Sequence, residues 1–133
     1  MTGLDTNVLV RFLVRDDAAQ AKAAERFLRE QCTTEEPGWV NRIVLCELVW
    51  VLDRAYGYSR EHIAGVLERL LRTRQLAVEG FPHAWKALSA YRDAKGDFAD
   101  SLLASTNREA GCGHTVTLDR HAARLEGMVL LTP

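Results

Sequence analysis

The sequence predicts an α/β fold in which a parallel sheet carries helices on both faces. Short strand-like apolar segments alternate with amphipathic helical segments along the whole chain. No linker, low-complexity segment or internal repeat divides the 133 residues, which is the length of one domain. The composition, 47% hydrophobic and 26% charged, is ordinary for a globular protein. We therefore expect a single domain, residues 1–133, with five strands.

The segment up to residue 57 is expected to alternate between strand and helix twice. A short apolar start leads into apolar residues at helical spacing from Val8 to Leu13, so Asp5 stands where a strand changes into a helix. Pro37-Gly38 and Tyr56-Gly57 are stop signals for the later helices. The expected elements are a strand at 1–4, a helix over 8–13, a helix at 18–31, a strand at 39–41 and a helix at 43–55.

The remaining segment is expected to contain four further helices and three further strands. Ser59 and Asp97 are residues that cap helices, and Pro82 suits the first turn of a helix. Residues 115–118 alternate between polar and apolar as a strand does. The expected elements are a helix after Ser59, a strand at 76–78, a helix from Pro82, a helix from Asp97 to Ala110, a strand at 115–118, a short helix at 120–125 and a strand at 128–131.

Four acidic residues stand beside apolar segments, where a carboxylate without a partner is costly. Asp5 and Asp119 directly follow strands, Asp100 lies in the first turn of a helix, and Glu47 lies one turn into the helix at 43–55. In open α/β sheets ligands bind beyond the carboxyl ends of the strands. The four acids can therefore converge on one edge of the sheet as a metal site.

Helix capping is the alternative interpretation for three of these acids. Asp5 and Asp119 could cap the helices that follow them, and Asp97 with Asp100 fits a cap followed by an acid in the first turn. Glu47 has apolar neighbours before and after it, and such a carboxylate is seldom buried unless it is paired or binds a cation. Glu47 therefore favours the metal site.

The chemistry predicted for such a site is phosphodiester hydrolysis. Oxygen ligands select hard cations, and Mg²⁺ or Mn²⁺ binds through a few carboxylates while keeping waters and substrate phosphates. The metal lowers the pKa of a bound water and stabilises the developing charge on the phosphate. A nucleophilic serine or cysteine is not required.

Four sequence blocks resemble the PIN-domain ribonucleases, and within them the VapC-type toxins of toxin–antitoxin pairs. The blocks are LDTNVLVRFL at 4–13, VLCELVWVL at 44–52, DFADSLLAS at 97–105 and TLDRHAARL at 117–125. The resemblance implies an acidic pocket with Asp5 and Asp100 as the foremost metal ligands; its four acids are Asp5, Glu47, Asp100 and Asp119. Asp97 is a cap or an outer ligand, and the groups implied to orient ligands or phosphates are Thr6, Asn7 and Thr117.

The resemblance also implies the fold, the partners and the activity. The fold is a three-layer α/β/α sandwich with a five-stranded parallel sheet, and the expected partners are an RNA substrate, a second copy of the chain in a homodimer, and a small antitoxin that blocks the site. The activity is that of a Mg²⁺- or Mn²⁺-dependent endoribonuclease. The alternatives are a PIN-domain nuclease of RNA processing without an antitoxin, and a non-catalytic RNA-binding PIN module.

Charge and cysteine content limit the remaining possibilities. The net charge of −1 gives no global basic field, so any RNA contact must be local, for example through Arg11 or Arg15, although a solvated surface role is commoner for such arginines. Three cysteines without a C-x-x-C spacing argue against disulfides or zinc and favour the cytoplasm. The longest apolar segment, 43–52, is shorter than the roughly 20 residues of a membrane-spanning helix.

Overall fold

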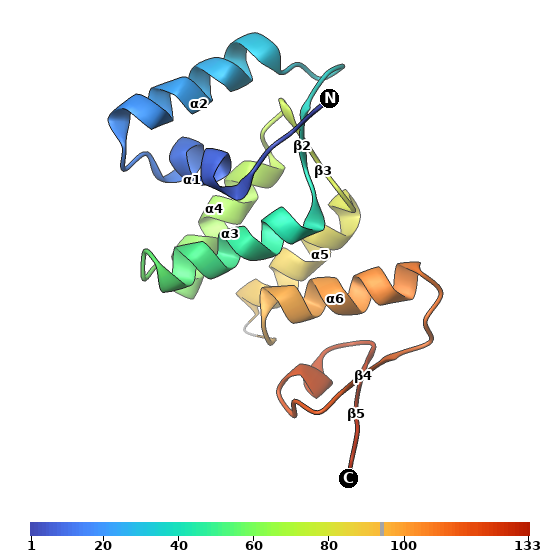
Figure 1. Ribbon diagram of the computed structural model, residues 1–133. Coiled ribbons are helices and arrows are strands. Elements are labelled where there is room, and N and C mark those ends of the chain that lie inside the picture. The colour runs from blue at the N-terminus through green and yellow to red at the C-terminus, as the bar shows by residue number, and fades with distance from the viewer. Residues whose placement is uncertain (94) are drawn as a thin grey trace. The chain divides into compact units, whose positions relative to one another are not determined.

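A computed structural model describes residues 1–93 and 95–133 of the chain as two compact units, Met1–Phe81 and Pro82–Pro133 (Figure 1). We call them the first unit and the second unit. Strands and helices alternate in both, and every strand pair is parallel. The α/β class predicted from the sequence is confirmed.

The first unit contains a three-stranded parallel sheet in the order β1-β2-β3. Gly3 pairs with Trp39, and Trp39 pairs in turn with Ala77. Four helices connect the strands, with α1 packed against α2 and α3, and α3 against α4. The elements in chain order are β1 (Thr2–Gly3), α1 (Thr6–Val14), α2 (Ala18–Gln31), β2 (Gly38–Val40), α3 (Arg42–Arg54), α4 (Arg60–Leu71) and β3 (Leu76–Val78).

Capping side chains determine where the helices of the first unit begin. Asp5 caps α1, Asp17 caps α2 and Ser59 caps α4, each by accepting a hydrogen bond from a backbone N–H of the first turn. Asn41 was expected to end a strand, but it caps α3, and its Oδ1 accepts the N–H of Val44 at 2.9 Å. The strand therefore ends one residue earlier than its apolar pattern predicts.

The core of the first unit lies where the helices meet the sheet. Its largest fully buried side chains come from one strand and three helices: Val40, Leu9, Leu45, Leu48, Leu52, Ile63, Leu67 and Leu70. Each helix shows the spacing of three and four residues that puts its apolar side chains on one face. This burial is the main driving force for the unit, because removing apolar surface from water contributes roughly 25 cal/mol per Å².

The described residues of the second unit form two helices, a short 3₁₀ helix and a two-stranded parallel sheet. Its elements are α5 (Phe81–Arg92), α6 (Phe98–Glu109), β4 (Thr115–Thr117), η1 (Ala122–Arg124) and β5 (Met128–Leu130). Val116 pairs with Val129, and an edge-to-face contact joins the rings of Tyr91 and Phe98. A small buried cluster of Ala104, Ala122, Leu125 and Met128 connects α6 to η1 and β5.

The expected five-stranded sheet is wrong for the described residues, which form one sheet of three strands and one of two. Apolar alternation reveals that a segment is extended but does not name its neighbour, because the pairing is made by backbone groups that all residues share. β1 is also only two residues long, and both are exposed. The helix expected at 120–125 is the shorter 3₁₀ helix η1.

The helices of the described residues do not include one that is long and apolar enough to cross a membrane.

Candidate functional site

Asp5 lies between β1 and the first turn of α1, as its place in the sequence predicts. Its backbone is extended, and its Oδ1 accepts the N–H of Thr6 at 2.7 Å. The capping interpretation is therefore confirmed for this residue. It uses one carboxylate oxygen, so Oδ2 remains available to a ligand, and the side chain is exposed.

Thr6 connects the carboxylate of Asp5 to that of Glu47. Its N–H binds Asp5, and its Oγ1 donates a hydrogen bond to Oε1 of Glu47 at 2.9 Å. Thr6 is 7% exposed, whereas both acids are exposed. A buried hydroxyl thus holds an exposed carboxylate in place across 41 residues of sequence. No sequence pattern predicted this contact, because a threonine at the start of a helix reads equally well as part of a cap.

Glu47 has apolar neighbours along α3, as expected, but it lies on the exposed face of this helix. The buried face of α3 carries Val44 and Leu48, but Glu47 points away from it. Its other neighbours on the open face are Ile43, 71% exposed, and Trp50, 59% exposed. The apolar pattern around Glu47 continues onto a face that the first unit does not cover. Glu47 is therefore not a buried acid. The feature that points to a function for Glu47 is its hydrogen bond with Thr6.

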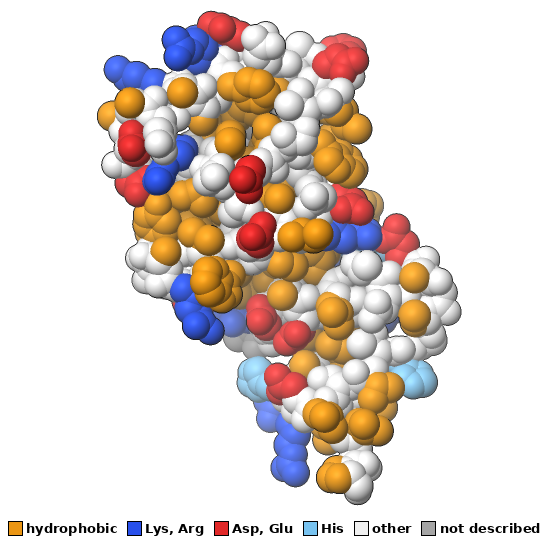
Figure 2. Space-filling model, in the orientation of Figure 1, with side chains coloured by type: hydrophobic (Ala, Val, Ile, Leu, Met, Phe, Trp, Pro, Cys, Tyr) orange, Lys and Arg blue, Asp and Glu red, His pale blue; other side chains and the backbone are white. Residues whose placement is uncertain are grey.

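Exposed apolar side chains and carboxylates lie beside each other on the surface drawn in Figure 2. Around Asp5 the surface is hollowed into a groove of about 730 Å³, whose polar lining includes Asn7, Arg11 and Gln20. Asn7 is exposed there. The Arg11 guanidinium binds Asp16, Tyr56 and Gln20, and Arg15 pairs with Glu25 at 2.9 Å. The two arginines considered for RNA binding are therefore held by neighbours of the first unit.

The acids of the second unit are grouped around the start of α6. Asp97 caps this helix, and its Oδ1 accepts the N–H of Ala99 at 3.1 Å. Asp119 caps the turn before η1, where its Oδ1 accepts the N–H of His121 at 2.8 Å. Thr117 fixes the same turn, because its Oγ1 accepts the N–H of Asp119 at 3.0 Å.

Asp100 is the half-buried member of this group and the one whose acidity changes. Burial raises the pKa of its carboxyl, and the negative charges of Asp97 and Asp119 raise that pKa further. Its carboxylate accepts no hydrogen bond from the described residues. A group in this position gains from a nearby cation, which would offset both the lost hydration and the like charges.

The donor chemistry of these acids fits a hard cation. All five carboxylates offer oxygen, and none forms an ion pair with a basic side chain in residues 1–93 and 95–133. Within the part of the chain that the structure describes, no three His, Cys, Asp or Glu side chains are arranged as a metal-binding group. Asp5 and Glu47 belong to the first unit, and Asp97, Asp100 and Asp119 belong to the second.

Comparison with known proteins places the chain in a family. A profile of the PIN domain matches residues 4–128, a span that includes every acid described above. The chain belongs to the PIN-domain family. A VapC ribonuclease from Aquifex aeolicus (strain VF5) is 30% identical over 122 residues, which cover 92% of this chain and 90% of that protein. No solved structure matches the chain significantly.

Family membership confirms the resemblance read from the four sequence blocks. The matched span begins at Leu4, immediately before Asp5, and ends at Met128, the first residue of β5. PIN-domain nucleases use divalent metals, and the VapC-like relative is named a ribonuclease. The chain is therefore a VapC-like member of a nuclease family.

Proposed function

We propose that this PIN-domain protein is a Mg²⁺- or Mn²⁺-dependent endoribonuclease that hydrolyses RNA phosphodiester bonds. The observation that carries the proposal is the set of carboxylates without ion pairs, each at the start of a helix or held by a buried hydroxyl. Only Asp100 is half-buried, and there the carboxylate has lost hydration that a cation could replace. The match over residues 4–128 to the PIN domain supports the same activity.

The proposed metal ligands are Asp5 and Asp100, with Asp97, Glu47 and Asp119 as further acids of the site. Asp5 keeps Oδ2 free of its cap, and Asp100 has no hydrogen-bond partner in the described residues, so both can give an oxygen to a cation. Asp97 and Asp119 each use Oδ1 as a cap, as Asp5 does, and each keeps Oδ2 for a ligand. A bound divalent cation would acidify its water and stabilise the charge that develops on the phosphate.

Glu47 is proposed to orient the attacking water. Its Oε1 is occupied by the Thr6 hydroxyl, which leaves Oε2 to accept a proton from water. Thr6 therefore acts as a positioning residue. Asn7 lies in the groove beside Asp5, where its amide can donate a hydrogen bond to a phosphate oxygen, and Thr117 keeps Asp119 in its turn.

The activity is tested by incubating purified protein with a labelled single-stranded RNA in EDTA, Mg²⁺ or Mn²⁺. We expect cleavage only with metal, and its loss in Asp5→Asn, because an amide keeps the shape of the side chain but is a poor ligand for a hard cation. Asp53→Asn is the matched control, since Asp53 is an exposed acid of α3 outside the proposed site. Equal cleavage by Asp5→Asn and wild type would refute the assignment.

The proposed biological role is that of a toxin in a type II toxin–antitoxin pair in the cytoplasm, acting as a homodimer. The resemblance of the four sequence blocks to VapC-type toxins supports this role, and a relative is named a VapC ribonuclease. Co-expression with the neighbouring small gene should give a stable complex in which RNA cleavage is suppressed. An active nuclease that does not bind the neighbouring protein would instead indicate an RNA-processing enzyme.

A further inference from the structure

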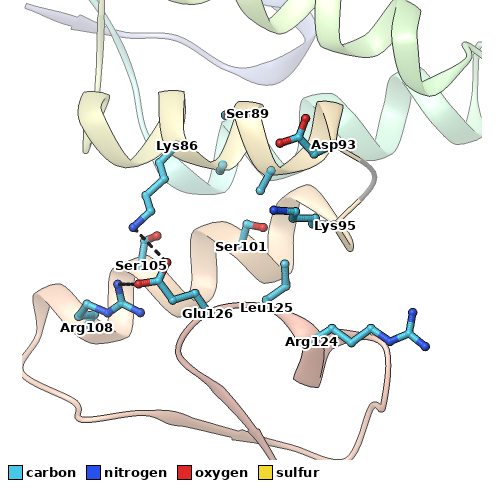
Figure 3. A pocket seen from close by; sticks show the side chains of 12 residues that line it. Lys86, Ser89, Asp93, Lys95, Ser101, Ser105, Arg108, Arg124, Leu125 and Glu126 are labelled. Carbon is cyan, nitrogen blue, oxygen red and sulfur yellow. Dashed lines mark hydrogen bonds and ion pairs between the residues drawn. The ribbon is translucent and has the colours of Figure 1, made fainter.

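A second hollow lies wholly within the second unit and contains none of the proposed acids. It has a volume of about 430 Å³ and is lined by residues of α5, α6 and the segment that joins η1 to β5 (Figure 3). Its walls include Lys86, Lys95, Arg108, Ser101, Ser105 and Glu126. We call it the basic pocket. Its size is within the range of about 300–1,000 Å³ that small-molecule sites have.

The basic pocket carries an excess of positive charge. Four basic side chains line it against two acids, Asp93 and Glu126. Glu126 binds both Lys86, at 3.5 Å, and Arg108, at 3.3 Å, and the three side chains meet at one end of the pocket in Figure 3. Lys95 pairs with no acid of the described residues. Its ammonium group is therefore available to an anion.

Ser101 supplies a buried polar group that needs a partner. The residue is 8% exposed, and its Oγ is buried without a hydrogen-bond partner in the described part of the chain. Figure 3 shows this hydroxyl directed toward the ammonium group of Lys95, and the two groups form no hydrogen bond with each other. Lys95 is exposed, so its side chain can move to admit a ligand. An oxygen bound by both groups would satisfy the Ser101 hydroxyl.

The chemistry of the basic pocket selects an oxyanion. An ammonium group and a serine hydroxyl are both donors to a tetrahedral anion, and phosphate can accept from several donors at once. A metal cation is disfavoured because basic side chains outnumber acids in the lining. The volume also exceeds that of a bare phosphate, which leaves space for an attached sugar.

We propose that the basic pocket binds a phosphate group, with Lys95 and Ser101 as its principal donors. An RNA strand is the source that fits best, because Ser101 directly follows Asp100 on α6 and a substrate held at Asp100 carries further phosphates on either side. This choice of source rests on the proposed function. A free phosphate monoester is the other source, and the two are separated by experiment.

The test measures binding to the full chain in EDTA, so that neither metal nor cleavage contributes. Fluorescence anisotropy with a labelled single-stranded RNA, repeated over a range of salt concentrations, gives the salt dependence of the affinity. For single strands each phosphate contact contributes about 0.7 to the slope of log K against log salt concentration. Lys95→Gln should lower the magnitude of that slope by about 0.7, whereas Ser101→Ala should weaken binding with the slope unchanged.

Two further variants serve as controls for Lys95. Lys22→Gln removes an exposed lysine from α2, outside the basic pocket, and should leave both affinity and slope as in wild type. Lys95→Arg keeps the charge and should keep most of the affinity. If Lys95→Gln and Lys22→Gln have the same slope as wild type, RNA does not use the basic pocket.

Inorganic phosphate and adenosine 5′-monophosphate test the second source by thermal unfolding in EDTA, against chloride at equal ionic strength. Either anion should raise the melting temperature of wild type but not of Lys95→Gln. If the anions stabilise only wild type while Lys95→Gln binds RNA as wild type does, the phosphate site is supported and its ligand is a free phosphate compound. Absence of both effects would overturn the proposal. Binding is measured without metal, so a failure of the proposed nuclease activity, seen as equal cleavage by Asp5→Asn and wild type, leaves this test unaffected.

Discussion

The hydrogen bond from Thr6 to Glu47 allows a quantitative test of how the first unit positions an acid. Thr6→Val replaces the hydroxyl with a methyl group of similar size and keeps the backbone N–H that binds Asp5. A hydrogen bond to a charged acceptor contributes about 1.5–3 kcal/mol. Glu47 is exposed and regains water when the bond is lost, so we expect a loss of about 1 kcal/mol in the free energy of unfolding.

A double-mutant cycle isolates this bond from other effects of the substitution. Chemical denaturation of wild type, Thr6→Val, Glu47→Ala and the double variant should give a coupling energy of about 1 kcal/mol. Thr106→Val is the control, because the hydroxyl of Thr106 donates to the carbonyl of Leu102 at 2.7 Å and does not contact Glu47. It should show no coupling with Glu47→Ala. A coupling energy near zero for Thr6 would refute the reasoning.

The same variant also distinguishes positioning from stability alone. If Thr6 holds Glu47 for catalysis, Thr6→Val should lower kcat for RNA cleavage under conditions where the protein remains fully folded, while KM changes little. An unchanged kcat together with reduced stability would make the bond a structural one.

The acids of the second unit give three further predictions. Burial and like charge raise the pKa of the Asp100 carboxyl. The metal-free protein should therefore lose stability as the pH rises from the ordinary aspartate pKa of about 3.9 through this raised value. Asp100→Asn should flatten this fall and raise the melting temperature in EDTA at pH 7; an unchanged pH profile would contradict the assigned cause. Asp119→Asn should likewise raise the melting temperature in EDTA and weaken the response to Mn²⁺; a less stable variant with a full metal response would make Asp119 only a cap. Asp97→Ala should cost about 1 kcal/mol of stability, measured by denaturation, while some cleavage remains; complete loss of cleavage with unchanged stability would make Asp97 the ligand.

Helix and strand bounds and helix caps could be predicted well from the sequence. The helix at Ala18–Gln31 and the strand at Leu76–Val78 were predicted with the bounds they have in the structure, and Ser59 and Asp97 cap the helices expected after them. These features depend on side chains a few residues apart, and their patterns are visible in the sequence itself.

Long-range structure was predicted less well, for physical reasons. The strands were recognised, but strand partners are chosen by backbone hydrogen bonds that leave no residue pattern, so the separation into sheets of three and two was missed. The apolar neighbours of Glu47 predict apolar surroundings for its carboxylate, but only one side of α3 is buried and Glu47 lies on the other. Its contact with Thr6, like the basic pocket at Lys95 and Ser101, joins residues whose separation in the sequence carries no periodic signal.

Asp5 and Asp100 are the two proposed metal ligands, and titration calorimetry with Mn²⁺ is the sharpest test of that proposal. Asp5→Asn in the first unit and Asp100→Asn in the second should each weaken Mn²⁺ binding by at least tenfold, a loss of about 1.4 kcal/mol. Asp53→Asn should bind Mn²⁺ as wild type does. If either variant binds Mn²⁺ as tightly as wild type does, that residue is not a metal ligand and its proposed role is refuted.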